Sequence, residues 1–73
     1  MSHIDSAKHE VVLNGQTVVS AAATLEALLA EQGYLGRRVA TAVNGDFVPE
    51  RLRRDTRLSA GDTIEVVSAR QGG

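Results

Sequence analysis

The sequence predicts a small α+β domain in which a mixed sheet of about five strands packs against one main helix. Two Asn-Gly pairs, at 14–15 and 44–45, lie between short runs rich in β-branched residues. Asn-Gly between such runs is typical of a tight hairpin turn. One segment between the two pairs has leucines at helical spacing. The element order is therefore strand, strand, helix, strand, short strand, strand.

The first hairpin follows from two short apolar runs, Val11 to Leu13 and Thr17 to Val19, on either side of Asn14-Gly15. A type I′ turn needs positive φ at both central positions, which Asn and Gly tolerate. We expect strands over 9–13 and 16–20. Residues 1–8 are polar and without periodicity, and we expect a loose N-terminal arm there.

A short helix is predicted from about 24 to 32. Thr24 is a good N-cap residue, and Gln32-Gly33 supplies a stop signal. The leucines that form the apolar face of this helix are Leu25, Leu28 and Leu29.

The second half of the chain begins with a linker over 34–38. The run 39–43 carries no strongly polar residue and suits a strand buried on both faces. After Asn44-Gly45 a short strand over 46–48 follows, and Pro49 ends it. The charge-rich segment 50–56 has Leu52 as its apolar anchor.

The last strand is predicted over 63–67, after the turn signal Ala60-Gly61-Asp62. Ile64 and Val66 alternate with Glu65, so the two apolar side chains share one face. A hairpin, a crossing helix and further strands suit a mixed sheet with right-handed crossover connections.

Length and composition favour one cytoplasmic domain over residues 1–73. The chain has no cysteine, a net charge of −1 and two aromatic residues, Phe47 and Tyr34. With only these two aromatic side chains and no net positive charge, nucleic acid is a poor ligand. No segment suits a membrane span or a secretion signal, and we expect a monomer when free.

The chain ends in Gln71-Gly72-Gly73, and we interpret the carboxylate of Gly73 as the reactive group. Two glycines form an end without side chains, which can enter a narrow channel. We expect a flexible tail from 68 to 73, about 20 Å long at roughly 3.3 Å per residue. Gly72 keeps the tail narrow, and Arg70 is a candidate for steering it.

The sequence resembles the ubiquitin-like β-grasp proteins and, more closely, the ThiS family of sulfur carriers in thiamine biosynthesis. The resemblance covers nearly the whole chain from residue 11 on. The residues that carry it are Val12-Leu13-Asn14-Gly15, Thr24-Leu25, Leu28-Leu29, Val39-Ala40, Val43 to Pro49, Leu58, Gly61-Asp62, Ile64 to Val67 and Gln71-Gly72-Gly73. Many relatives place a basic residue directly after Val-Pro, whereas Glu50 stands before Arg51 here.

The resemblance implies how the tail reacts. A ubiquitin-activating-like adenylyltransferase uses ATP and Mg²⁺ to adenylate Gly73, and a persulfide donor converts the adenylate into a thiocarboxylate. A thiazole synthase then receives the sulfur. This chain is implied to be a protein substrate that binds no cofactor or metal, because a flexible tail cannot preorganise catalytic groups.

Other side chains give weaker signals. Phe47 is either a partner contact or a packed core residue. The arginines of one segment, Arg51, Arg53, Arg54 and Arg57, lie near Asp46, Glu50 and Asp55 in sequence and indicate a solvated mixed-charge surface. His3 and His9 lack a third metal ligand, and Ser20 and Ser68 lack a paired histidine.

Three alternative functions remain open on the same fold. One is sulfur transfer to another acceptor, as in the small subunit of molybdopterin synthase or a carrier for cysteine or other sulfur metabolites. Another is a ubiquitin-like modifier of lysines, and the third is a binding module whose tail is inert. Shortness and the segment Asn44 to Pro49 favour the thiamine carrier.

Overall fold

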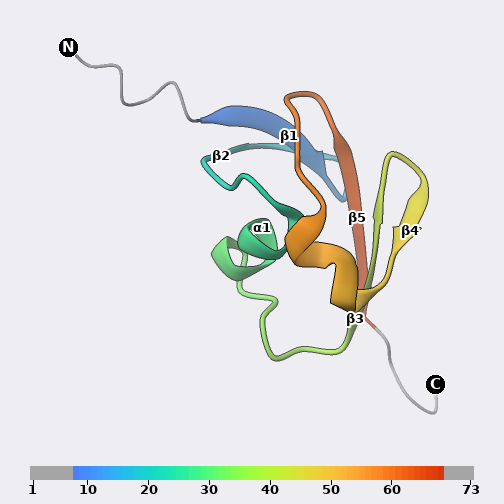
Figure 1. The fold of residues 1–73 in the computed structure, drawn as a ribbon. Coiled ribbons are helices and arrows are strands. Elements are labelled where there is room, and N and C mark those ends of the chain that lie inside the picture. The colour runs from blue at the N-terminus through green and yellow to red at the C-terminus, as the bar shows by residue number, and fades with distance from the viewer. Residues whose placement is uncertain (1–7, 69–73) are drawn as a thin grey trace.

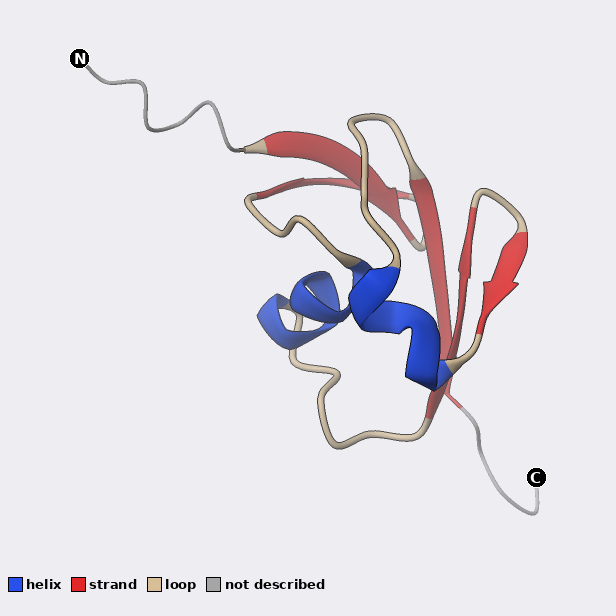
Figure 2. Ribbon diagram, in the orientation of Figure 1, coloured by secondary structure: helices blue, strands red, loops and turns tan. Residues whose placement is uncertain are grey.

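The computed structural model describes residues 8–68, and a mixed β-sheet carries its helices on one face (Figure 1). The elements in chain order are β1 (His9–Leu13), β2 (Gln16–Ser20), α1 (Leu25–Glu31), β3 (Val39–Val43), β4 (Asp46–Val48), the 3-10 helix η2 (Glu50–Asp55) and β5 (Thr63–Ser68). Figure 2 shows the two layers, with α1 and η2 side by side on the same side of the sheet. The predicted α+β class and element order are confirmed.

The described residues form a five-stranded sheet in the order β2-β1-β5-β3-β4. β1 and β5 are parallel, with Val12 opposite Thr63, and the other neighbouring strands are antiparallel. The last strand of the chain is therefore the central strand of the sheet. Both hairpin turns are as predicted, with positive φ at Asn14 and Asn44 and at the glycine that follows each.

Helix α1 forms the second layer and matches the predicted helix closely. The Thr24 hydroxyl oxygen accepts a hydrogen bond from the Ala27 backbone N–H at 3.2 Å, which caps the first turn. Gly33 follows the helix with φ +82°, so a residue without a Cβ continues the chain there. The buried apolar core consists of Val11, Leu13, Ala22, Leu25, Leu28, Leu29, Val48, Leu58, Ile64 and Val66.

The expectation that residues 39–43 are buried on both faces is wrong. Thr41 is buried, but Ala40 is exposed and Val39 is half-buried. The reason is that α1 and η2 cover only one face of the sheet, so every second side chain of β3 points away from the core.

Leu52 is not the anchor of segment 50–56, because its side chain is 43% exposed. No residue of η2 is buried. The segment is instead held by polar contacts of Arg53, and the next buried apolar side chain along the chain is Leu58.

The last strand is one residue longer than predicted. Ser68, which we expected to begin the tail, lies in β5 opposite Val39. The alternation of β5 is confirmed, with Ile64 and Val66 buried and Glu65 exposed. Lys8 is exposed and lies outside the strands, and the remainder of the expected arm and tail, residues 1–7 and 69–73, lies outside the described residues.

Candidate functional site

The end of β5 is the part of the fold from which the predicted reactive tail begins. Ser68 pairs with Val39 and Val67 pairs with Ala40 in the antiparallel ladder with β3. The predicted site residues Arg70, Gln71, Gly72 and Gly73 lie outside the described residues. The structure therefore describes Ser68, which we call the base of the predicted tail, and the surfaces around it.

Asn14, in the turn after β1, extends the contact between β1 and β5. Its backbone N–H donates to the Ile64 carbonyl oxygen at 2.9 Å. Its side-chain oxygen accepts from the Val66 N–H at 2.8 Å, and its side-chain nitrogen donates to the Val66 carbonyl at 3.2 Å. The side-chain amide thus takes the place of a backbone peptide and supports β5 beyond the end of β1.

Asn44, in the second Asn-Gly turn, holds the beginning of β5. Its backbone N–H donates to the Thr63 carbonyl at 2.7 Å, and its side-chain oxygen accepts from the Thr63 N–H at 2.9 Å. The Asn44 side-chain nitrogen also donates to Asp62 at 3.1 Å. The two Asn-Gly turns therefore hold the strand that carries the tail from its two sides.

Arg53, from η2, supports the strand that pairs with the base of the tail. Its Nη2 donates to the Val39 carbonyl at 2.7 Å, and its Nε donates to Thr41 Oγ1 at 3.1 Å. The buried Thr41 hydroxyl in turn donates to the Val48 carbonyl at 2.8 Å. Since Val39 is opposite Ser68, Arg53 stabilises the beginning of β3 at the point where β5 ends.

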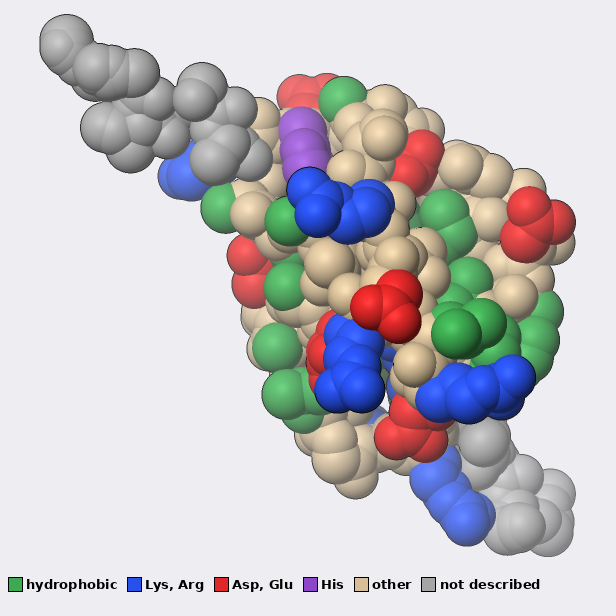
Figure 3. Space-filling view, in the orientation of Figure 1, with side chains coloured by type: hydrophobic (Ala, Val, Ile, Leu, Met, Phe, Trp, Pro, Cys, Tyr) green, Lys and Arg blue, Asp and Glu red, His purple; other side chains and the backbone are tan. Residues whose placement is uncertain are grey.

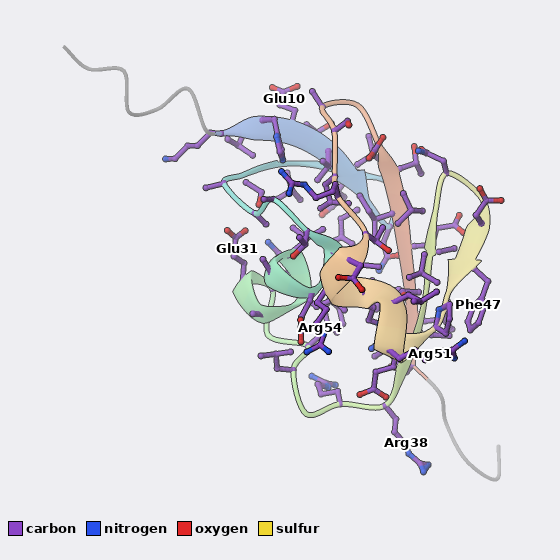
Figure 4. All side chains as sticks on the ribbon, viewed as in Figure 1. Glu10, Glu31, Arg38, Phe47, Arg51 and Arg54 are labelled. Atoms are coloured by element: carbon purple, nitrogen blue, oxygen red, sulfur yellow. The ribbon has the colours of Figure 1, made fainter. Side chains whose placement is uncertain are left out.

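Among the large apolar side chains exposed on the face of the sheet that the helices leave open, two lie beside β3. Phe47 of β4 is 69% exposed, and Val67 of β5 is 63% exposed. Phe47 lies opposite Ala42 and Val67 lies opposite Ala40, so the small side chains of β3 separate the two. We call Phe47, Ala40, Ala42 and Val67 the outer patch. Figure 4 shows the Phe47 ring directed away from the body of the molecule.

A pocket of about 430 Å³ opens between the end of α1, the loop before β3 and η2. Its apolar lining includes Leu29, Tyr34 and Val39. Its charged lining consists of Arg37, Arg38, Arg53, Glu26 and Glu50. The pocket reaches Val39, so it adjoins the base of the tail on the helix-covered side of the sheet.

The remaining candidates from the sequence have local roles. His9 Nε2 lies 3.0 Å from the Ala22 carbonyl oxygen. Ser20 is buried, donates to Glu31 at 2.7 Å and accepts from the Ala22 N–H at 2.9 Å. Within residues 8–68, acidic and histidine side chains form no cluster that could hold a metal ion, and no helix there is long and apolar enough to cross a membrane.

Sequence reasoning missed Arg53 and the side-chain roles of Asn14 and Asn44. The Asn-Gly pairs predicted the turns, but not that each asparagine side chain bonds to β5, which lies 52 residues beyond Asn14 and 19 residues beyond Asn44. Arg53 was one of four arginines in its segment, and nothing local distinguishes it from Arg54.

The fold and the arrangement of its last strand define a class of protein, the small ubiquitin-like β-grasp domains. A crystal structure of a thiamine biosynthesis protein (ThiS) from Geobacter metallireducens has the same fold, with a TM-score of 0.72. The two chains are 22% identical, and the alignment covers 88% of this chain and 99% of that one. The model of the ThiS family matches residues 7–73, so this chain belongs to the ThiS family. No curated protein sequence gives a match.

Proposed function

We propose that this chain is the sulfur carrier for thiazole formation in thiamine biosynthesis, with the carboxylate of Gly73 as the carrying group. The observation that carries the proposal is the family match, which runs over residues 7–73 and includes the terminal glycines. The β-grasp fold supports it, because the central strand β5 leads directly into that segment. The absence of cysteine is consistent with sulfur held on a carboxylate.

The proposed chemistry begins with activation, because a carboxylate has no good leaving group. An activating enzyme of the adenylyltransferase type transfers AMP from ATP, with Mg²⁺, onto the Gly73 carboxylate and releases pyrophosphate. The terminal sulfur of a partner persulfide attacks the carbonyl carbon, and AMP leaves. A thiol then reduces the sulfur–sulfur bond, which leaves a thiocarboxylate on Gly73 for transfer to a thiazole synthase.

In this proposal the chain supplies a substrate group and a docking shape, and its partners supply catalysis. Residues 69–73 can span about 17 Å at roughly 3.3 Å per residue, enough to enter a partner's active site. Catalytic donors must be fixed around the reacting carbonyl. The partners are therefore the ones that hold ATP, Mg²⁺ and the sulfur donor.

We assign the outer patch to partner binding. Aromatic residues are enriched at the centre of protein interfaces, and Phe47 is exposed on an open sheet face together with Val67. The patch includes Val67, one residue before the end of β5. A partner that covers the patch would therefore hold the base of the tail at its active site.

The test is the intact mass of the protein after incubation with ATP, Mg²⁺ and the activating enzyme from the same organism. We expect an AMP-sized adduct without a sulfur donor, and a sulfur-for-oxygen increment once a persulfide donor and a thiol are added. Deletion of Gly73 should abolish both changes and leave the circular dichroism spectrum unchanged, because the residue lies beyond β5. An unchanged mass for the intact chain would contradict the proposal.

A further inference from the structure

Four exposed arginines lie on the two segments that flank the pocket next to the end of β5. Arg37 and Arg38 lie in the loop before β3, and Arg51 and Arg54 lie on η2. We call Arg37, Arg38, Arg51 and Arg54 the basic rim. Figure 4 places Arg51 and Arg38 near the end of β5, with Arg38 directed outward, and places Arg54 between η2 and α1.

The basic rim is built by the tertiary structure from two segments that are separate in sequence. The pocket described above lies between them, with Arg37 and Arg38 on one side and η2 on the other. Val39 follows Arg38 directly and is opposite Ser68, so the rim adjoins the base of the tail. Figure 3 shows basic side chains over the lower part of the surface, with acidic side chains between them.

The charge of the rim is local, because the whole chain has a net charge of −1. Glu26 and Glu50 line the pocket beside these arginines, and other acidic residues lie further away; Figure 4 shows Glu10 at the opposite end of the sheet from Arg38. Such a separation of charge orients an approaching protein by its field, even when the net charge is small. The end that carries the tail is the positive end.

The chemistry of the pocket favours an acidic protein surface as the ligand. Two glutamates, Glu26 and Glu50, line the pocket together with Arg37, Arg38 and Arg53. These carboxylates would repel a free phosphate group placed among them. Carboxylates on a protein surface can instead be spaced so that they face the exposed arginines of the rim and lie away from the glutamates. Opposite charges face each other in this way at complementary protein interfaces.

We propose that the basic rim docks against an acidic lip around the active site of the activating enzyme. This inference rests on the proposed function and adds the chemistry by which that partner recognises the carrier. The rim speeds association and turns the tail toward the active site, whereas the outer patch on the other face supplies apolar contact. The adenylation step itself does not use the rim.

The experiment measures adenylation by the activating enzyme from the same organism, together with the association rate without ATP. Arg38→Glu and the double variant Arg37→Glu/Arg38→Glu are compared with Arg57→Glu, which places the same charge change at an exposed arginine outside the pocket. At about 50 mM NaCl we expect the association rate and kcat/KM to fall about tenfold or more for the double variant. We expect kcat at saturating carrier to be unchanged, and the loss to shrink at about 500 mM NaCl.

A second pair of variants separates charge from folding. Arg37→Lys/Arg38→Lys keeps the positive charge and should retain kcat/KM to within about threefold. Thermal melts should agree for all variants, because both arginines are exposed. The inference is overturned if Arg57→Glu lowers the rate as much as Arg38→Glu, or if neither variant lowers the rate. In both cases, adenylation of the wild type still supports the proposed function. If the wild type neither binds nor reacts, both are overturned.

Discussion

At the scale of single residues, Arg53 does the most to connect the site to the fold. It is the arginine of η2 whose guanidinium reaches the sheet, through Val39 and Thr41. Every buried side-chain nitrogen or oxygen within residues 8–68 has a hydrogen-bond partner, so the network around Thr41 is complete. Loss of one member would leave polar groups in the first half of β3 unpaired.

We therefore expect Arg53→Met to destabilise the fold by about 1–3 kcal/mol, because two hydrogen bonds from a charged donor are lost. Arg54→Met is the matched control, since Arg54 is an exposed neighbour, and it should change stability by no more than about 0.5 kcal/mol. Urea denaturation measures both. Amide hydrogen exchange at Val67 and Ser68 should be faster in Arg53→Met alone; equal exchange rates in the two variants would show that Arg53 does not support the base of the tail.

At the scale of secondary-structure elements, the sheet depends on α1 for its covered face. Leu25, Leu28 and Leu29 of this helix are buried against Val11, Ile64 and Val66 of the sheet. A chain of this size buries only about 60% of its unfolded surface. Each buried leucine therefore contributes a large share of the total stability.

Leu28→Ala should cost about 2–5 kcal/mol, from lost burial and from the cavity that remains. Glu26→Ala, on the exposed side of the same helix, should stay within about 0.5 kcal/mol of the wild type. The measurement is the midpoint of chemical unfolding. Since Leu28→Ala removes a large share of a total stability of about 5–15 kcal/mol, Leu28→Met provides the milder substitution. Similar midpoints for Leu28→Ala and Glu26→Ala would contradict the assigned packing.

At the scale of the whole molecule, two surfaces of different chemistry meet at the end of β5. The outer patch lies on the open face of the sheet, and the basic rim lies on the side of the helices. β5 is the central strand of the sheet. The open face and the helix-covered face of the sheet therefore both adjoin the end of β5. A partner that approaches along the strand can contact both surfaces at once.

Phe47→Ser tests the outer patch. Because Phe47 is exposed, the free energy of unfolding should change by less than about 1 kcal/mol, while affinity for the activating enzyme should fall about tenfold or more if the ring is an interface anchor. Val19→Ser is the control, since Val19 is 61% exposed on β2, at the opposite edge of the sheet. Isothermal titration measures the affinity, and equal effects of the two substitutions would exclude a special role for Phe47.

The sequence by itself determined the elements and their turns. Positive φ at Asn14 and Asn44, the Thr24 cap and the buried leucines of α1 all depend on residues a few positions apart, so local chemistry was enough to predict them. The alternation of Ile64, Glu65 and Val66 likewise predicted the buried face of β5. The family resemblance, confirmed by the match over residues 7–73, also came from the sequence.

Only the tertiary structure decided which elements meet. It placed β5 between β1 and β3, brought Arg53 rather than Leu52 against the sheet, and left one side of β3 exposed. These outcomes join residues far apart in sequence, such as Val12 and Thr63. They depend on which arrangement of strands and helices buries the most apolar surface at the least entropic cost of loop closure. Both quantities are summed over the whole chain, so no local segment determines them.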